Sequence, residues 1–348
     1  MAVLLAALTG ACARAAPVLP EPHALEYHRV PWEDAFPSDA VVDDRGRLWF
    51  TDRLTHALGR YDPDPATFRR YPTPSPRSAP YGLVRGPDGA LWFGESNGRR
   101  LGRLDPETGA ITEIEVPGLA HGPQLLAWSG GLLWFTSRRD GVIGRYDPVS
   151  GEARLWRDRV PEPYGIAATP DGRVWVAAHG GSTLHRVDIL PDSGEAVDYT
   201  EPGRLRVPQE VLDRLSPEQV ERFRNPRIGI GIRRIAAGPD GRLWAAGHRR
   251  GRVLGIDPDT GDRRTLASLD PSSQPYAVGV DPWGRVWYSE QGTDGIVVYD
   301  PGTDRRLRYP LPLRGGTVRD LAIDADRSRV WLPMSDLGVI AVVELGSP

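Results

Sequence analysis

A chain of 348 residues, 40% hydrophobic and 26% charged, is long enough for two ordinary domains or for one large repeat architecture with a sizeable core. All 43 basic residues are arginines, they form no continuous stripe, and the formal net charge is −3, so we do not expect nucleic-acid binding. The 40 glycines and 34 prolines indicate many turns.

The first 22 residues are expected to form a signal peptide. A short apolar run, Val3 to Leu8, is followed by small residues with two Ala-x-Ala sites. Cys12, the only cysteine, follows Leu-Thr-Gly-Ala, which loosely resembles a bacterial lipoprotein box. No later segment is apolar over the roughly 20 residues that a spanning helix needs. We therefore predict an exported protein that is periplasmic, secreted, or anchored in the cell envelope by a lipid on Cys12.

A single strand is expected at residues 25–30, and it opens a domain that covers residues 23–348. A tryptophan then recurs after a turn and one or two apolar residues, with spacings of 43, 42, 41, 69, 43 and 44 residues. A period in this range marks a solenoid or a propeller. The seven tryptophans are Trp49, Trp92, Trp134, Trp175, Trp244, Trp287 and Trp331.

Each repeat indicates four short strands. In the second repeat these are residues 80–84, 90–93, 100–104 and 111–116, with turn residues such as Gly-Pro-Asp-Gly at the junctions. Four alternating strands separated by tight turns are typical of a propeller blade and do not fit a unit of two strands and a helix.

The long spacing leaves room for an insertion at residues 205–226. Helical spacing near 207–215, an N-cap at Ser216 and a stop at Asn225-Pro226 predict a helical hairpin. We expect it to lie over the mouth as a lid, and the alternative is a surface decoration. The last repeat has only three strands, at residues 318–323, 329–332 and 339–345. Pairing the 25–30 strand with it closes the ring, so we predict an all-β, seven-bladed propeller.

The expected ligand mouth is lined by residues that open the first strand of each blade and by residues just after each tryptophan. Tyrosine, arginine and carboxylate side chains meeting there suit an anionic or peptidic ligand. The candidate ligand-binding residues are Tyr81, Tyr164, Tyr276, Arg233, Arg319, Glu95 and Asp52.

His179, His248 and Glu290 are the candidates for a catalytic or metal site. They stand on the mouth side of blades four, five and six and would together suit a divalent ion such as Mg²⁺. An alternative stays open for both residue types. The acids recur at equivalent positions of the repeat and would then bind the neighbouring blade, while the histidines would lie in solvent.

The segments from Ala79 to Glu95 and from Leu101 to Asp105 closely resemble the repeat of the streptogramin B lyases. The resemblance covers residues 27–345 apart from the insertion. It implies a seven-bladed propeller that opens a cyclic depsipeptide by magnesium-assisted elimination, with a histidine as general base.

The chain departs from that family at its reacting positions. Where the family has histidines that open the first strands of the last two blades, this sequence has Tyr276 and Arg319. The family's metal-binding glutamate corresponds to Thr317, and an acid after the last tryptophan corresponds to Ser335. Only the acids Glu95 and Glu290, which belong to the repeat consensus, match the family. The resemblance therefore predicts the fold and does not predict the same reaction.

Three functions are compatible with these residues. The first is an exported binding propeller, expected to be monomeric, that takes a small molecule, glycan or peptide in its mouth. The second is a metal-dependent enzyme, either a lyase or a lactonase-type hydrolase. The third is a protein-interaction scaffold that uses the blade rims and the insertion. The absence of a complete catalytic set favours the first.

Overall fold

The structure of the protein is a computed structural model. It describes residues 19, 25–179, 183–188, 196–198, 201–202, 227–228, 231–267, 270, 272–311 and 313–345. The leader, Cys12 included, and the predicted helical insertion at 205–226 lie outside the described residues. Within the described part of the chain, no helix is long and apolar enough to cross a membrane.

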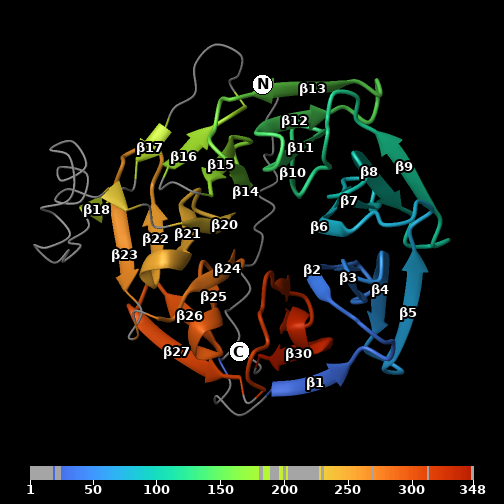
Figure 1. The fold of residues 1–348 in the computed structure, drawn as a ribbon. Coiled ribbons are helices and arrows are strands. Elements are labelled where there is room, and N and C mark those ends of the chain that lie inside the picture. Colours follow the sequence, from blue (N-terminus) through green and yellow to red (C-terminus); the bar gives the residue numbers. More distant parts are fainter. Residues whose placement is uncertain are drawn as a thin grey trace, which may run out of the picture.

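Seven four-stranded antiparallel sheets form the blades of a ring (Figure 1). The strands of blades 1 to 3 are β2 Pro37–Val42, β3 Leu48–Asp52, β4 Ala57–Asp62, β5 Thr67–Pro72, β6 Pro80–Arg85, β7 Leu91–Glu95, β8 Arg100–Leu104, β9 Ile111–Glu115, β10 Leu125–Ser129, β11 Leu132–Ser137, β12 Val142–Tyr146 and β13 Ala153–Arg157. Those of blades 4 and 5 are β14 Pro163–Ala168, β15 Val174–Ala178, β16 Thr183–Arg186, β17 Ala196–Asp198, β20 Ile232–Ala237, β21 Leu243–Gly247, β22 Arg252–Ile256 and β23 Arg263–Ala267.

Blades 6 and 7 complete the ring. Their strands are β24 Pro275–Val280, β25 Val286–Glu290, β26 Gly295–Asp300, β27 Arg305–Pro310, β28 Ala322–Asp324, β29 Arg329–Met334, β30 Val339–Glu344 and β1 Leu25–Arg29. A separate two-residue pair joins β18 (Glu201–Pro202) to β19 (Arg227–Ile228). The helices among the described residues are the 3-10 turns η1 His248–Arg250, η2 Gln291–Thr293 and η3 Ser335–Leu337.

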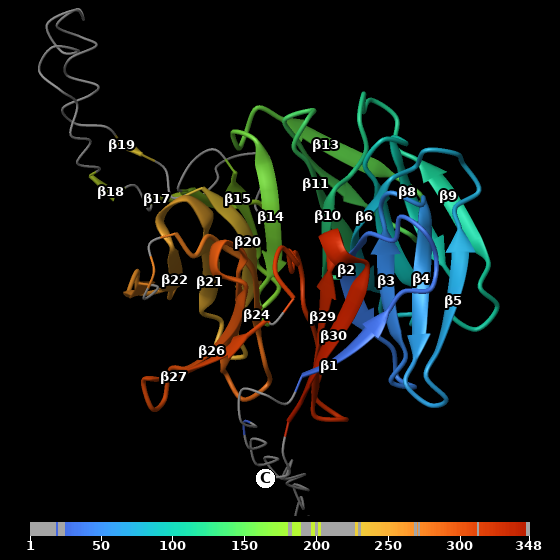
Figure 2. The same cartoon turned by 60° about the horizontal axis from the view of Figure 1, so that its bottom comes forward.

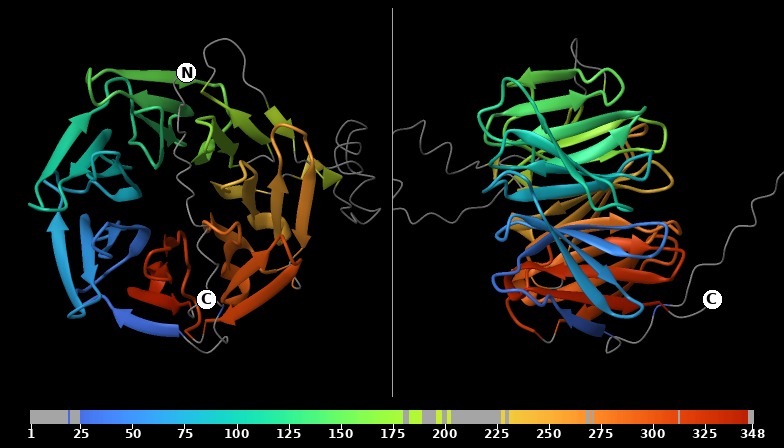
Figure 3. Two further views of the ribbon diagram at one scale, coloured as in Figure 1. Left: turned by 180° about the vertical axis from the view of Figure 1, so that it is seen from behind. Right: turned by 90° about the vertical axis from the view of Figure 1, so that its right-hand side faces the viewer.

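The first strand closes the ring, as predicted. β1 pairs antiparallel with β30, from Leu25 opposite Val343 to Arg29 opposite Val339. Figures 1 and 2 both show β1 beside β30, so the two ends of the domain share blade 7. Figure 3 shows the resulting disc from behind and from the side. The predicted seven-bladed, all-β propeller is confirmed.

The hydrophobic core is divided among the seven interfaces between adjacent blades. The repeating tryptophans explain this division, because all seven are at most 3% exposed and several pack on the following blade. Trp49 of blade 1 packs with Leu91 and Phe93 of blade 2, and Trp331 of blade 7 packs with Leu48 and Phe50 of blade 1. Each blade therefore buries its apolar faces only against its two neighbours, as repeat architectures do.

A β-bulge near the start of the inner strands positions the mouth residues. The pairing register shifts by one residue between Pro37 and Ala40 in β2, and the same shift occurs at the equivalent place in β6, β14, β20 and β24. A bulge breaks strict alternation and re-aims side chains at the edge of a sheet. Consecutive residues therefore both reach other blades: Arg233 contacts the ring of Tyr276 in the adjacent blade 6, and Arg234 contacts Asp39 across the axis in blade 1.

Candidate functional site

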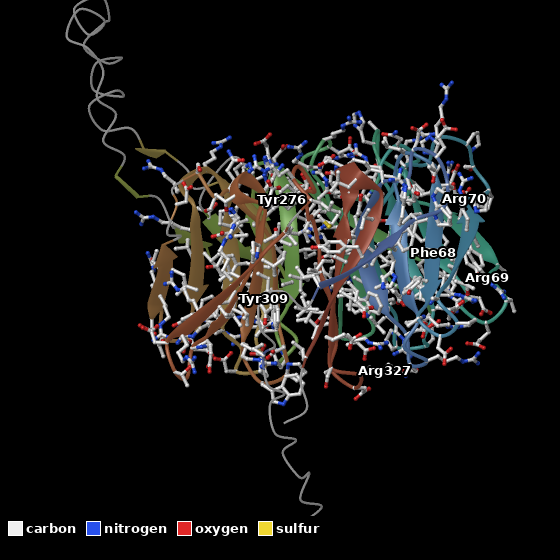
Figure 4. The ribbon with its side chains drawn as sticks, turned by 90° about the horizontal axis from the view of Figure 1, so that it is seen from below. Phe68, Arg69, Arg70, Tyr276, Tyr309 and Arg327 are labelled. Atoms are coloured by element: carbon white, nitrogen blue, oxygen red, sulfur yellow. The ribbon has the colours of Figure 1, made fainter. Side chains whose placement is uncertain are left out.

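Three tyrosines from alternate blades meet on the propeller axis. The hydroxyl oxygens of Tyr81 (β6), Tyr164 (β14) and Tyr276 (β24) lie 2.7, 3.1 and 3.4 Å apart. All three side chains are buried. In Figure 4, Tyr276 lies toward the face of the disc opposite the turn that holds Arg327. We call this group the tyrosine floor, because it lies where the inner strands start from the mouth face.

Arginines cover the tyrosine rings. The guanidinium carbon of Arg53 lies 5.6 Å from the ring centre of Tyr81, and that of Arg138 lies 5.6 Å from the ring centre of Tyr164. Arg233 and Arg319 lie 5.4 and 5.5 Å from the ring centre of Tyr276. Guanidinium groups at such distances are attracted to aromatic faces. Arg53, Arg138, Arg233 and Arg319 are called the mouth arginines below.

The mouth arginines have few acidic partners. Among the described residues, Arg53, Arg138 and Arg233 form no ion pair with a carboxylate, and Arg319 reaches only Asp336, at 3.8 Å. Arginines on the face of the disc opposite the mouth do have acidic partners: Arg47, for example, forms an ion pair with Asp43 at 2.6 Å. Within the described ranges, the mouth arginines therefore carry more positive charge than the carboxylates paired with them neutralise.

Burial and the nearby arginines both lower the pKa values of the two mouth histidines, His179 and His248. Burial lowers the pKa of His179 to about 4, with further contributions from the charges of Arg233, Arg138 and Arg249 and from His248. Burial and Arg233 also lower the pKa of His248. The imidazole of His179 is therefore neutral near pH 7 and provides one acceptor nitrogen.

A second charged cluster, the axial ion network, lies one residue further along the inner strands. It consists of Asp39 (β2), Arg234 (β20) and Asp320, which precedes β28. Arg234 donates through Nη2 to Oδ1 of Asp39 and through Nε to the carbonyl of Arg319 at 3.1 Å. Burial opposes the charge of Arg234, yet Asp39 and Asp320 raise its pKa. Burial and then Asp39 raise the pKa of Asp320 to about 7, against the effect of Arg234.

The structure brings together five of the predicted binding residues and places the two acids elsewhere. Asp52 accepts hydrogen bonds from the indole of Trp32 at 2.6 Å and from the backbone N–H of Phe36 at 3.0 Å. Glu95 is fully buried and accepts from Nε of Arg100 at 2.9 Å. Burial and the nearby Glu113 raise the pKa of Glu95 to about 7. Glu95 therefore binds a group of its own blade, and Asp52 binds groups of the segment that joins β1 to β2.

Glu290 also makes contacts within its own blade. It accepts from Nε of Arg308 at 3.0 Å and from the hydroxyl of Thr293 at 3.1 Å. It lines a cavity of about 340 Å³ with residues of β25, β26 and β27, away from the tyrosine floor. In the part of the chain that the structure describes, no three His, Cys, Asp or Glu side chains are grouped to hold a metal ion, so Glu290, His248 and His179 do not form one.

Sequence reasoning missed Arg53 and Arg138 and the axial ion network. The two arginines stand four residues after Trp49 and Trp134, which is the position that holds His179 and His248 in blades 4 and 5. This shared position after the tryptophan could have identified both arginines from the sequence. No sequence pattern could have identified the axial ion network, because it depends on the bulge in the inner strands.

A profile described as the virginiamycin B lyase family matches residues 13–211, more than half of the chain. The chain belongs to the virginiamycin B lyase family. A virginiamycin B lyase of Nocardia farcinica (strain IFM 10152) is 29% identical over 266 residues, which cover 73% of this chain and 77% of that protein.

Solved structures of the family share the fold. Virginiamycin B lyase of Staphylococcus aureus matches with a TM-score of 0.75 and 20% identity, over 92% of this chain and 98% of that one. A catalytically inactive histidine-to-alanine variant of the S. aureus enzyme with quinupristin matches with a TM-score of 0.76 and 19% identity, over 92% and 99% of the two chains. At these identities the likeness shows the fold alone.

The residues at the family's reacting positions do not suit a magnesium ion. Arg319 carries a positive charge, and the hydroxyl of Ser335 is fully buried and donates to the carbonyl of Pro37 at 2.7 Å. The hydroxyl of Thr317 is neutral and accepts from Gln291 at 3.2 Å. Mg²⁺ prefers carboxylate oxygens and water, so this set lacks the charge that would hold it.

Proposed function

We propose that this virginiamycin B lyase family member is a binding propeller that takes a small molecule or peptide in its mouth and does not carry out the family's elimination. The observation that carries the proposal is the tyrosine floor with its mouth arginines. Tyr276 and Arg319 stand where the family resemblance places histidines, and both have partners within this site.

The site supports recognition more directly than catalysis. The buried tyrosine rings hold the mouth arginines in one geometry, and the arginines provide directional donors, which are a usual component of a ligand pocket. Elimination requires a base that is free to take a proton. Burial raises the pKa values of Tyr81 and Tyr164, so those hydroxyls stay protonated, and His179 is already in contact with two arginines.

Quinupristin incubated with the protein and Mg²⁺ is expected to stay cyclic. Chromatography with mass measurement checks this, because elimination opens the ring without changing its mass whereas hydrolysis adds the mass of water. A metal-dependent linear product of unchanged mass would identify the chain as a lyase, and a hydrated product would identify it as a lactonase. Either result would overturn the proposal.

Binding in the mouth is tested by melting the wild type and Arg319→Gln with a panel of short peptides, oligosaccharides and organic acids. At least one compound should raise the melting temperature of the wild type and have a clearly smaller effect on the variant. A panel in which no compound separates the two proteins would contradict binding at this site.

We also propose that the protein is exported, on the basis of its first 22 residues. Native protein is expected to begin at Cys12 or a few residues after it, and to fractionate with the cell envelope or the medium. Mass spectrometry of the native N-terminus measures this directly. An intact Met1 on cytosolic protein would exclude export.

A further inference from the structure

His179 lies between two guanidinium groups. Its Nε2 is in hydrogen-bond contact with Nη1 of Arg233, and its Nδ1 lies 3.4 Å from Nη1 of Arg138. The ring also meets the ring of Tyr164 edge-on, with centroids 5.2 Å apart. The guanidinium group of Arg138 lies over the ring of Tyr164. Blades 3, 4 and 5 therefore each supply one polar side chain, Arg138, His179 and Arg233, to the same place.

In the part of the chain that the structure describes, the guanidinium donors of Arg138 and Arg233 hydrogen-bond to no acceptor apart from the imidazole of His179. An arginine can only donate, and a neutral imidazole has one acceptor nitrogen. If Nε2 accepts from Arg233, then Nδ1 carries the proton and directs an N–H toward the N–H of Arg138. A protonated imidazole would make two such conflicts. An acceptor atom from outside the chain resolves the conflict, because one anionic oxygen accepts from both donors.

Among the described residues, the carboxylate near His179 is that of Glu162, which lies at the edge of the group. Oε2 of Glu162 is 3.9 Å from Nδ1 of His179, beyond hydrogen-bond distance, and its side chain is 56% exposed. The opposite face is different. There the arginines of a cavity of about 600 Å³, among them Arg47 and Arg103, each meet an acid. Among the residues that the structure describes, arginines of the mouth such as Arg138 and Arg233 therefore differ from those of the opposite face in forming no ion pair with a carboxylate.

We propose that Arg138, His179 and Arg233 form an anion subsite that binds the carboxylate or phosphate group of the mouth ligand. This inference rests on the proposed binding function and names the class of ligand. One oxygen of the anion lies between Nη1 of Arg138 and Nδ1 of His179, and Arg233 fixes the imidazole tautomer by donating to Nε2. Tyr164 supplies the apolar wall of the subsite.

The test is calorimetric binding of inorganic phosphate and, separately, of succinate in a buffer low in chloride. The two probes distinguish a phosphate-bearing from a carboxylate-bearing ligand. Arg138→Gln and Arg233→Gln should each weaken binding of the preferred probe about tenfold or more, since charge-assisted hydrogen bonds are lost. Melting curves of both variants establish that they fold.

Two exposed neighbours serve as matched controls. Arg139→Gln removes the same charge one residue away and should change affinity less than twofold. Glu162→Gln removes the competing carboxylate and should tighten anion binding severalfold, and it keeps the test valid even if an arginine variant fails to fold.

Equal effects of Arg138→Gln and Arg139→Gln would reduce the result to general electrostatic attraction and overturn the subsite. Unchanged or weaker binding by Glu162→Gln, or no binding of either probe, would overturn it as well. The binding function itself would survive those outcomes if an uncharged compound still distinguishes wild type from Arg319→Gln.

Discussion

Deletion of residues 24–31 is expected to abolish the stable monomeric propeller. The deletion removes β1 and with it five paired positions against β30. Each hydrogen bond contributes a net stabilisation of about 0.5–1.5 kcal/mol, buried Val30 about 1.5–3 kcal/mol, and half-buried Leu25 and Tyr27 a smaller amount each. The sum is comparable to the whole stability of an ordinary protein, about 5–15 kcal/mol.

The exposed edge should also drive aggregation. β30 reads Val-Ile-Ala-Val-Val-Glu, and its first five residues are buried. Without β1 this apolar strand becomes an unpaired edge, which favours pairing with other chains. Size-exclusion chromatography and melting curves measure the effect, and a deletion of residues 14–21, equal in length, is the control. A monomeric 24–31 deletion that melts like the control would show that β1 does not close the ring.

The fold could be predicted from the sequence because one repeat supplies several consistent signals. The tryptophan period gave the number of blades, and the turns gave their strands. The missing fourth strand after Val339–Glu344 and the surplus strand at Leu25–Arg29 then predicted the pairing that the structure contains. Errors in one blade do not accumulate, since each sheet packs its faces against its two neighbours and non-adjacent blades meet through side chains at the axis.

The site could be predicted only in part. The residues that open the inner strands do converge, and Tyr81, Tyr164 and Tyr276 are in contact across the axis. The acids after the tryptophans do not join them, because a side chain at the end of a strand can turn toward the axis or back toward its own loop. Glu95 turns toward Arg100, and no local pattern of the sequence distinguishes these two directions.

Asp39→Ala is expected to lower the free energy of unfolding by about 3–5 kcal/mol. Asp39 and Arg234 are both almost fully buried and form an ion pair across the axis between blades 1 and 5. Removing one member leaves a buried charge with less compensation, which costs more than losing the pair as a whole. Urea unfolding at pH 8 measures the change. A loss below about 1 kcal/mol would show that solvent or Asp320 stabilises Arg234 without Asp39.

Asp320→Asn, the matched change on the third member of the network, should act in the opposite direction. Burial and Asp39 raise the pKa of Asp320 to about 7 from its ordinary value of 3.8. The native state therefore binds more protons than the unfolded state between these two values, so wild-type stability falls as pH rises from about 4 to about 7.

Asparagine resembles the protonated acid and can still accept the hydrogen bond from the backbone of Ala40. It should therefore remove that loss of stability. At pH 8 we expect the variant to be more stable than the wild type by about 2–4 kcal/mol, with the difference shrinking toward zero near pH 4. Unfolding curves of both proteins across this range test the sign, because the other titrating groups cancel in the comparison. A variant that is less stable at pH 8 would mean that Arg234 requires both carboxylates in their charged form.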